Sequence, residues 1–300
     1  MSFKCGFIGI IGRANAGKST LINALVHEKV AIATYKAQTT RNVIRGILTS
    51  DDYQMIFMDT PGIHKAKSTL GREMNRAAFN TMHGVDVIYY IVDGTKKFNQ
   101  GDEFIIRSLK NNNDIPVILL VNKLDKLHAS DKLDALEDWN SRMDFAEVLP
   151  ISALQGKNLD MLLDVTLQYL PEMPAIYPKD MVTDAPESFL ISEIIREKTL
   201  FCLDKEVPHS IAVVTESVEY KKDVMVISAL ICVERDSQKG IVIGKGGEML
   251  KKISSEARKE LEDRFGQKVY LTTFVRVEEN WPDKLRKLQD LGISEKKEYE

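Results

Sequence analysis

Residues 12–19 read Gly-Arg-Ala-Asn-Ala-Gly-Lys-Ser, which matches the phosphate-binding pattern G-x-x-x-x-G-K-[ST] at each fixed position. The pattern follows an apolar run typical of a buried strand and precedes a helix-like segment, the context that separates it from a chance glycine turn. Backbone N–H groups at a helix N-terminus bind anions, and glycines let the chain wrap around phosphates. Lys18 is then placed to reach the β- and γ-phosphates, and the Ser19 hydroxyl to ligate Mg²⁺. The predicted phosphate-binding residues are Gly12, Asn15, Ala16, Gly17, Lys18, Ser19 and Thr20.

The segment Asn122-Lys123-Leu124-Asp125 indicates which base is bound. It ends the apolar run 116–121, and nucleotide sites of open α/β sheets lie at that end of the strands. Guanine presents N1–H and its 2-amino group as adjacent donors, and one carboxylate accepts from both, whereas adenine lacks this pair. Asp125 is therefore the predicted reader of the base. Asn122 is predicted to brace the loop and reach the purine edge, and the stem of Lys123 to cover the ring.

A second base contact is predicted after the apolar run 147–151, where Ser152, Ala153 and Leu154 follow. The backbone N–H of Ala153 is expected to donate to guanine O6. A metabolic enzyme that uses ATP is the competing class for a phosphate loop alone, and residues 122–125 argue against it. Displacement of bound GDP by ATP as readily as by GTP would favour that class.

Two further segments predict the metal site and the γ-phosphate contact. Asp59-Thr-Pro-Gly62 ends the strand-like run 54–58, where an acidic residue can hold Mg²⁺ through water and the Gly62 N–H can meet the γ-phosphate. Gln38-Thr39-Thr40-Arg41 lies on a loop, and one threonine should complete the ligation of Mg²⁺. Thr40 is the predicted ligand, and Thr39 remains the alternative. The predicted metal ligands are thus Ser19, Thr40 and Asp59, and the predicted catalytic residues are Lys18, Thr40 and Gly62.

A glycine turn in the second half of the chain predicts a different kind of site. Gly244-Lys245-Gly246-Gly247 has the G-x-x-G spacing of the loop with which KH modules clamp the backbone of about four nucleotides of RNA. The run 241–243 precedes it and an amphipathic helix over 249–265 follows, which favours this interpretation over a helix turn with a solvated charged face. Helical Lys251 and Lys252 are predicted to contact phosphates, together with the loop residues Gly244, Lys245, Gly246 and Gly247.

The elements that must position these residues form two patterns. In the first half, strand-like runs alternate with helical stretches, which predicts an α/β domain with a mostly parallel sheet covered on both faces. Residues 41–49 and 53–58 are predicted to form a hairpin that adds one antiparallel edge strand. Over 187–277 the order is helix, strand, strand, short helix, glycine loop, helix, strand, which predicts a C-terminal α+β domain that looks like a type II KH arrangement.

Length and prolines predict the domain boundaries. A chain of 300 residues favours two domains, and the four prolines at 171, 174, 178 and 186 indicate a linker. The predicted domains are therefore residues 1–170 and 187–300, joined by residues 171–186.

Composition limits the partners. The chain has 41 basic and 44 acidic residues, so a protein that coats nucleic acid through bulk charge is excluded, and DNA is not an expected partner. The three cysteines show no C-x-x-C spacing, which favours a reducing compartment and argues against a cysteine zinc site. The apolar runs fall far short of the roughly 20 residues that span a bilayer, and the N-terminus does not resemble a secretory signal.

In this order and spacing, the motifs resemble those of the Era-type GTPases, and residues 38–41, 59–64 and 234–247 extend the resemblance over nearly the whole chain. The resemblance implies a phosphate-loop GTPase domain followed by a type II KH domain. It implies hydrolysis of GTP to GDP with Mg²⁺, binding to the 3′ region of 16S rRNA and a role in 30S ribosomal subunit assembly. It also implies a cytoplasmic location with peripheral membrane contact. A GTPase whose second domain binds protein or a membrane surface remains the alternative.

The resemblance also raises the question of how hydrolysis is achieved. Ras-like proteins place a water-orienting glutamine after the glycine of the metal motif, and here that position is Ile63, which has no polar side-chain atom. Ala14 and Ala16 depart from the proline and valine usual in the family, and we expect altered loop stiffness rather than lost binding. Asn15 resembles the asparagine that in relatives helps to hold K⁺ beside the transferring phosphates, so K⁺ is a predicted additional cofactor.

We expect GTP turnover to be faster in potassium than in sodium buffer, because a cation beside the phosphates would offset the charge that develops during transfer. Steady-state phosphate release in matched chloride salts measures this. Equal rates in the two salts would contradict the prediction.

Overall fold

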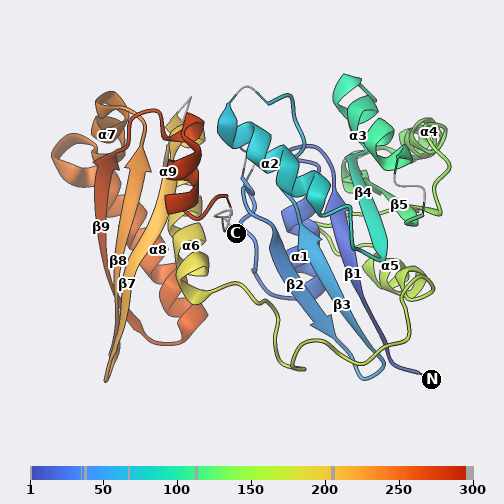
Figure 1. Cartoon of the computed structure of the whole chain (residues 1–300), viewed down its shortest axis with the longest axis horizontal. Helices are drawn as coiled ribbons and strands as arrows, with labels where there is room; N and C mark the ends of the chain where they lie inside the picture. The colour runs from blue at the N-terminus through green and yellow to red at the C-terminus, as the bar shows by residue number, and fades with distance from the viewer. Residues whose placement is uncertain are drawn as a thin grey trace, which may run out of the picture. The chain divides into compact units, whose positions relative to one another are not determined.

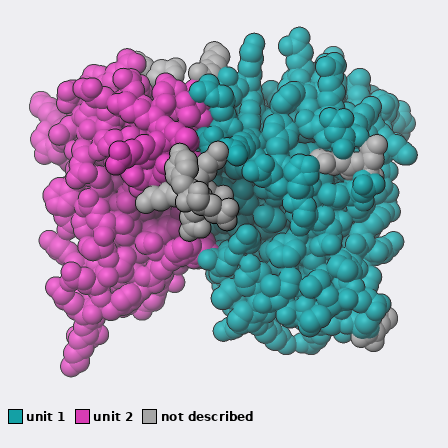
Figure 2. Space-filling view, in the orientation of Figure 1, with its two compact units in different colours: residues 1–33, 40–66, 71–184 teal, residues 34–39, 67–70, 185–300 magenta. Residues whose placement is uncertain are grey.

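The computed structural model describes residues 2–34, 36, 39–66, 68–111, 114–203 and 207–294. The chain forms two compact units, shown in different colours in Figure 2. Unit 1 comprises residues 1–33, 40–66 and 71–184, and unit 2 comprises residues 34–39, 67–70 and 185–300. Each unit has its own sheet and core.

Unit 1 is built on a six-stranded sheet of order β2-β3-β1-β4-β5-β6 (Figure 1). Neighbouring strands are parallel except for the β2–β3 pair, which forms the predicted antiparallel hairpin at the edge. The strands are β1 (Lys4–Ile11), β2 (Ile44–Thr49), β3 (Tyr53–Asp59), β4 (Val87–Asp93), β5 (Val117–Asn122) and β6 (Glu147–Pro150). The α/β fold with a mostly parallel sheet is confirmed.

Helices cover both faces of this sheet, as expected for strands that are apolar on both sides. The helices are α1 (Lys18–Val26), α2 (Thr69–Asn80), α3 (Gln100–Lys110), α4 (Ala129–Asn140) and α5 (Leu159–Thr166), with a 3₁₀ turn at η1 (Leu124–Lys126). Side chains of successive strand residues point to opposite faces of the sheet, as two neighbouring tyrosines of β4 illustrate. Tyr90 belongs to the core that α2, α3 and α4 cover, whereas the Tyr89 hydroxyl lies 2.6 Å from Thr166 Oγ1 of α5.

The proline-containing segment 171–184 packs along unit 1 rather than extending away from it. Cys5 N–H donates to Pro171 O at 3.1 Å, and at the outer edge of the sheet Ile47 N–H donates to Val182 O at 2.8 Å. We call residues 171–184 the strap. The sequence predicts a linker over 171–186, and the structure leaves only residues 185 and 186 between the strap and the first helix of unit 2.

A single buried side chain, Gln54 of β3, holds the middle of the strap. Its Oε1 accepts from Ile176 N–H at 2.8 Å and from Tyr177 N–H at 2.9 Å, and its Nε2 donates to Tyr177 O at 2.9 Å. Nε2 also donates to Thr49 Oγ1 at 2.9 Å. Gln54 is fully buried, so these bonds satisfy an amide that water does not reach.

Unit 2 carries a three-stranded sheet of order β7-β8-β9, with β7–β8 antiparallel and β8–β9 parallel. Its strands are β7 (Ala212–Lys221), β8 (Val224–Val233) and β9 (Lys268–Val277). The helices are α6 (Glu187–Cys202), α7 (Asp236–Ile243), α8 (Glu248–Phe265) and α9 (Leu285–Asp290), with 3₁₀ turns η2 (Val207–Ser210), η3 (Lys245–Gly247) and η4 (Trp281–Asp283). The predicted order of elements, including a short helix before the glycine loop, is confirmed.

The core of unit 2 lies between the sheet and helices α6, α7 and α8, and contains fully buried side chains from each, such as Ile195, Val242 and Ile253. Trp281 is also fully buried, and its Nε1–H donates to Ser210 O at 3.0 Å. Its ring is therefore a packing group and offers no exposed face on which a base could stack.

We expect Gln54→Ala to lower the free energy of unfolding by about 2–4 kcal/mol, because it removes several hydrogen bonds to strap N–H and C=O groups and leaves a cavity at a fully buried position. Chemical denaturation monitored by circular dichroism measures the change. Gln168→Ala, at an exposed glutamine of unit 1, is the matched control and should change stability little. A loss below 0.5 kcal/mol, roughly that of a surface substitution, would show that the strap does not depend on this amide.

Candidate nucleotide and RNA sites

The phosphate loop connects β1 to α1 through backbone conformations that suit its glycines. Asn15 and Gly17 both have positive φ, 64° and 109°. A Cβ at Gly17 would lie 2.2 Å from Asn122 Nδ2, so no larger residue fits there. Lys18 is buried, and its Nζ donates to Gly12 O at 3.1 Å and to Arg13 O at 2.9 Å. The ammonium group therefore lies inside the loop that the sequence predicts to hold phosphates.

The three predicted metal ligands come together at the ends of β3 and α1. Ser19 Oγ donates to Asp59 Oδ2 at 2.7 Å and lies 2.9 Å from Thr40 Oγ1, which is 3.2 Å from the same carboxylate oxygen. Within the described residues, Asp59 Oδ1 is buried without a hydrogen-bond partner. Hydroxyl and carboxylate oxygens are the ligands that Mg²⁺ prefers, so this set fits the ion.

The alternative threonine makes different contacts. The Thr39 hydroxyl lies 2.7 Å from Thr34 Oγ1 and donates to Lys36 O at 2.7 Å, within unit 2. Gln38, which precedes it in the motif, lies outside the described residues. The geometry therefore favours Thr40 over Thr39 as the third oxygen ligand.

Burial acts on both charges at this site. It lowers the pKa of Lys18 to about 8, and the nearby Asp59 carboxylate only partly opposes that shift. Burial likewise raises the pKa of Asp59, against the influence of Lys18 and the hydroxyls of Ser19 and Thr40. A buried charge is stabilised by an opposite charge nearby. Phosphates beside Lys18 and a divalent cation beside Asp59 would therefore stabilise the charged forms of these two side chains.

The predicted base site is organised by Asn122, at the end of β5. Its Nδ2 donates to Ala16 O at 2.9 Å, and its Oδ1 accepts from Ala153 N–H at 3.0 Å. The same side chain thus joins the phosphate loop to the loop after β6, which is the bracing role that the sequence predicts. The N–H of Ala153 is directed to Asn122 here, so its contact to guanine O6 stays a prediction.

The other base-site residues are also fixed by hydrogen bonds. Ser152 Oγ donates to Asp125 Oδ1 at 2.6 Å, which orients the carboxylate predicted to read the base. Lys123 has a left-handed backbone, and its Nζ donates to Asn15 O at 2.6 Å and to Asp93 Oδ2 at 2.8 Å. In contrast, Leu154 is 76% exposed, and Thr20, in the first turn of α1, is half-buried.

Two acidic residues that support the site were missed by sequence reasoning. Asp93, at the end of β4, anchors Lys123, and its position at a strand end was the available signal. Asp102 of α3 accepts from Arg13 of the phosphate loop at 3.3 Å and from Asn99 N–H at 3.2 Å. The spacing of Asn99 and Asp102 is that of a helix capping box, a pattern that could have identified this anchor.

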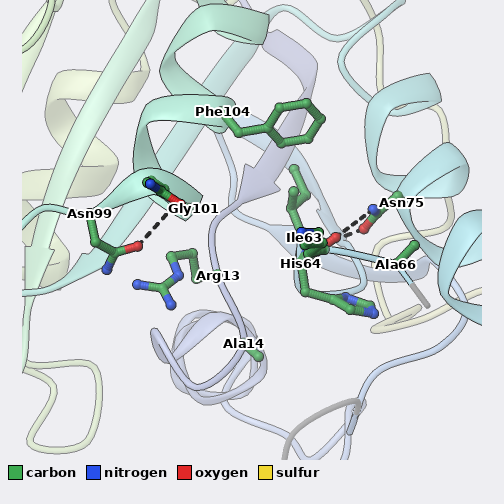
Figure 3. A pocket seen from close by; sticks show the side chains of 11 residues that line it. Arg13, Ala14, Ile63, His64, Ala66, Asn75, Asn99, Gly101 and Phe104 are labelled. Atoms are coloured by element: carbon green, nitrogen blue, oxygen red, sulfur yellow. Dashed lines mark hydrogen bonds between the residues drawn. The ribbon is translucent and has the colours of Figure 1, made fainter.

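The side of the phosphate loop where the γ-phosphate is predicted to lie carries a cavity of about 660 Å³ (Figure 3). Its lining comes from the phosphate loop, from residues 63–66, from Asn75 of α2 and from residues 99–104 at the start of α3. Ile63 is almost fully buried, and its N–H donates to Gly12 O at 3.3 Å. A Cβ at Gly62 would lie 2.7 Å from Ala14 N, so the close approach of this segment to the phosphate loop requires glycine.

In unit 2, the G-x-x-G loop forms the 3₁₀ turn η3 and opens α8. Gly244, Gly246 and Gly247 have φ of 75°, 60° and 83°, a region that favours glycine. A Cβ at Gly244 would meet Met249 Cβ at 2.7 Å, whereas the described residues leave open space around Gly246 and Gly247. The three lysines predicted to contact phosphates, Lys245, Lys251 and Lys252, are exposed, and Ile241 beside them is 49% exposed.

Comparison with known proteins agrees with this geometry. Residues 7–123 match the family model described as 50S ribosome-binding GTPase, and residues 206–282 match the KH domain model. A crystal structure of Era in complex with MgGDPNP and nucleotides 1506–1542 of 16S ribosomal RNA has 38% identity and a TM-score of 0.94. The alignment covers 97% of this chain and 99% of that one. The chain belongs to the Era family of GTPases.

A second crystal structure gives the same result. A variant of Era from Aquifex aeolicus, crystallised with GDP·AlF₄⁻, has 38% identity and a TM-score of 0.94, and the alignment covers 97% of this chain and all of that one. The predictions of a GTPase domain and a KH domain are therefore confirmed, and so is the activity, hydrolysis of GTP to GDP and phosphate with Mg²⁺.

The pKa of Lys18 makes nucleotide binding depend on pH. Above about pH 8 the protein without nucleotide loses this proton, and phosphates restore it, so binding takes up a proton and weakens as pH rises. Isothermal titration of GDP in buffers of different ionisation enthalpy measures the uptake. We expect nearly one proton at about pH 9 and little at about pH 7.

Lys110→Met, at an exposed lysine at the end of α3, is the control and should leave this uptake unchanged. A binding enthalpy independent of the buffer at both pH values would contradict a lowered pKa at Lys18.

Proposed function

We propose that this chain is a GTP-dependent switch that binds the 3′ region of 16S ribosomal RNA through its KH domain and acts in assembly of the 30S ribosomal subunit. The observation that carries the proposal is the loop 244–247, in which Lys245 and Gly246 are exposed and the three glycines have the positive φ that glycine favours. The family member crystallised with nucleotides 1506–1542 of 16S ribosomal RNA supports the choice of RNA.

The charge around this loop suits a short stretch of RNA. Residues 239–268 contain eight basic and five acidic residues, although the chain as a whole has a net charge of −3. RNA would therefore be held by a local patch, with the loop N–H groups and the exposed lysines on phosphates and with Ile241 beside the bases. Few phosphate contacts imply a modest dependence of affinity on salt.

The nucleotide site supports a division of roles in hydrolysis. Lys18 would hold the β- and γ-phosphates, and the Gly62 N–H would meet the γ-phosphate. Ser19, Thr40 and Asp59 would hold Mg²⁺, which neutralises charge that develops on the phosphates. Since Ile63 cannot orient water, the attacking water must be positioned by other groups, and slow intrinsic hydrolysis is expected.

The same contacts would make the protein a switch. Thr40 and Gly62 can engage a γ-phosphate or its metal only while GTP is bound, so residues 33–42 and 60–85 would be ordered by GTP and released after hydrolysis. We propose that this change biases the placement of the KH domain and thereby the timing of RNA release.

No helix in the described part of the chain is long and apolar enough to span a membrane. The peripheral membrane contact that the resemblance implies stays a prediction, and binding of protein by the second domain stays the alternative. Crosslinking of RNA to residues 239–252, tested with GTP and with GDP bound, would show that the second domain binds RNA rather than a protein or a membrane surface.

We expect Gly246→Asp to weaken binding of a 16S 3′-end RNA by at least roughly tenfold, because it places a carboxylate against the phosphates. GDP affinity should not change. Fluorescence anisotropy with labelled RNA and labelled GDP measures both.

The matched control is Gly266→Asp, which adds the same charge at a residue of φ 63° with open space around it. This position lies at the opposite end of α8, roughly 27 Å from the loop. Unchanged RNA affinity in Gly246→Asp, or an equal loss in Gly266→Asp, would refute the assignment of the loop.

A further inference from the structure

One side chain in unit 1 contacts the segment beside the γ-phosphate site and has no role so far. Asn75 of α2 donates from Nδ2 to His64 O at 2.7 Å and accepts from His64 N–H on Oδ1 at 3.2 Å (Figure 3). Both backbone polar groups of His64 thus bind one carboxamide. This planar group can donate and accept at once, which a carboxylate cannot do.

The residues before His64 are held as well. His64 Nδ1 lies 2.8 Å from Gly62 O, and because a carbonyl only accepts, Nδ1 carries the proton in this contact. The N–H of Ile63 donates to Gly12 O at 3.3 Å. Each of residues 62–64 therefore makes at least one hydrogen bond through its backbone. Helix α2 contributes to these bonds through the carboxamide of Asn75.

Helix α2 also leaves space for the His64 side chain. A Cβ at Gly71 would lie 3.2 Å from His64 Nε2, closer than most real Cβ contacts, so glycine leaves room for the imidazole. Asn75 follows Gly71 by four residues, which places the two on the same face of the helix. One face of α2 thus provides both the space for the His64 ring and the carboxamide for its backbone.

We propose that Asn75 is a positioning residue for GTP hydrolysis. By holding the His64 peptide groups against α2, it fixes the Gly62 N–H and keeps Ile63 buried beside the phosphate loop. Gly62 lies three residues after Asp59, which belongs to the proposed magnesium site. A shift of this segment would therefore move the Gly62 N–H away from the γ-phosphate and leave the base site unchanged. The inference rests on the proposed contact between the Gly62 N–H and the γ-phosphate.

Asn75→Leu tests this role, since leucine has similar size and neither hydrogen-bonding group. We expect single-turnover hydrolysis to slow by about tenfold and affinity for GDPNP to fall severalfold, because both depend on Gly62. GDP affinity should be unchanged, since the base and β-phosphate contacts lie elsewhere. Asn75→Asp keeps the acceptor but directs a carboxylate at His64 O, so it should show the same selective loss.

Asn80→Leu, at an exposed asparagine of the same helix, is the matched control and should behave as the unmodified protein. The proposal is overturned if Asn75→Leu leaves hydrolysis and the GDPNP-to-GDP affinity ratio unchanged. It is also overturned if both affinities fall equally with the melting temperature, which would indicate general destabilisation. Equal affinity of the unmodified protein for GDPNP and GDP would instead refute the proposed γ-phosphate contact.

Discussion

The carboxamide of Asn122 joins the loops on which the nucleotide site depends. It binds Ala16 of the phosphate loop and Ala153 of the loop after β6, while the adjacent Lys123 reaches Asn15 and Asp93. These groups meet because parallel strands deliver their carboxyl ends to one edge of the sheet. The predicted phosphate and base sites are therefore joined by one side chain, and displacing either loop would disturb the other.

The two halves of the chain share one structural feature, a glycine-containing loop at the N-terminus of a helix. Each presents a glycine loop that opens a helix, Gly12–Gly17 before α1 and Gly244–Gly247 before α8. Backbone N–H groups at a helix N-terminus attract phosphate without any large net charge. With the proposed roles of the two loops, a chain with a net charge of −3 could bind both a nucleotide and RNA. The loops differ in exposure, since Lys18 is buried and Lys245 is exposed, which suits a small nucleotide and a polymer respectively.

Much of this architecture was predictable from the sequence because its signals are local. The phosphate loop, the Asn122–Asp125 segment and the order of elements in unit 2 all depend on short spacings. The packing of the strap was not predictable, because its contacts join distant parts of the chain. Gln54, for example, is one polar residue within an apolar strand, and its strap partners lie more than 120 residues away. The Asn75 contact is similarly hidden, since an asparagine eleven residues after His64 forms no recognised pattern.

The strap also sets the length of free chain that precedes α6. Sixteen extended residues, 171–186, would span roughly 50 Å and let a tethered domain sample a wide volume. With 171–184 packed along the sheet, only Ala185 and Pro186 precede α6, a span of roughly 7 Å, and the ring of Pro186 restricts its own φ. Packing of the strap therefore leaves a much shorter free segment before α6 than the prolines suggest from the sequence.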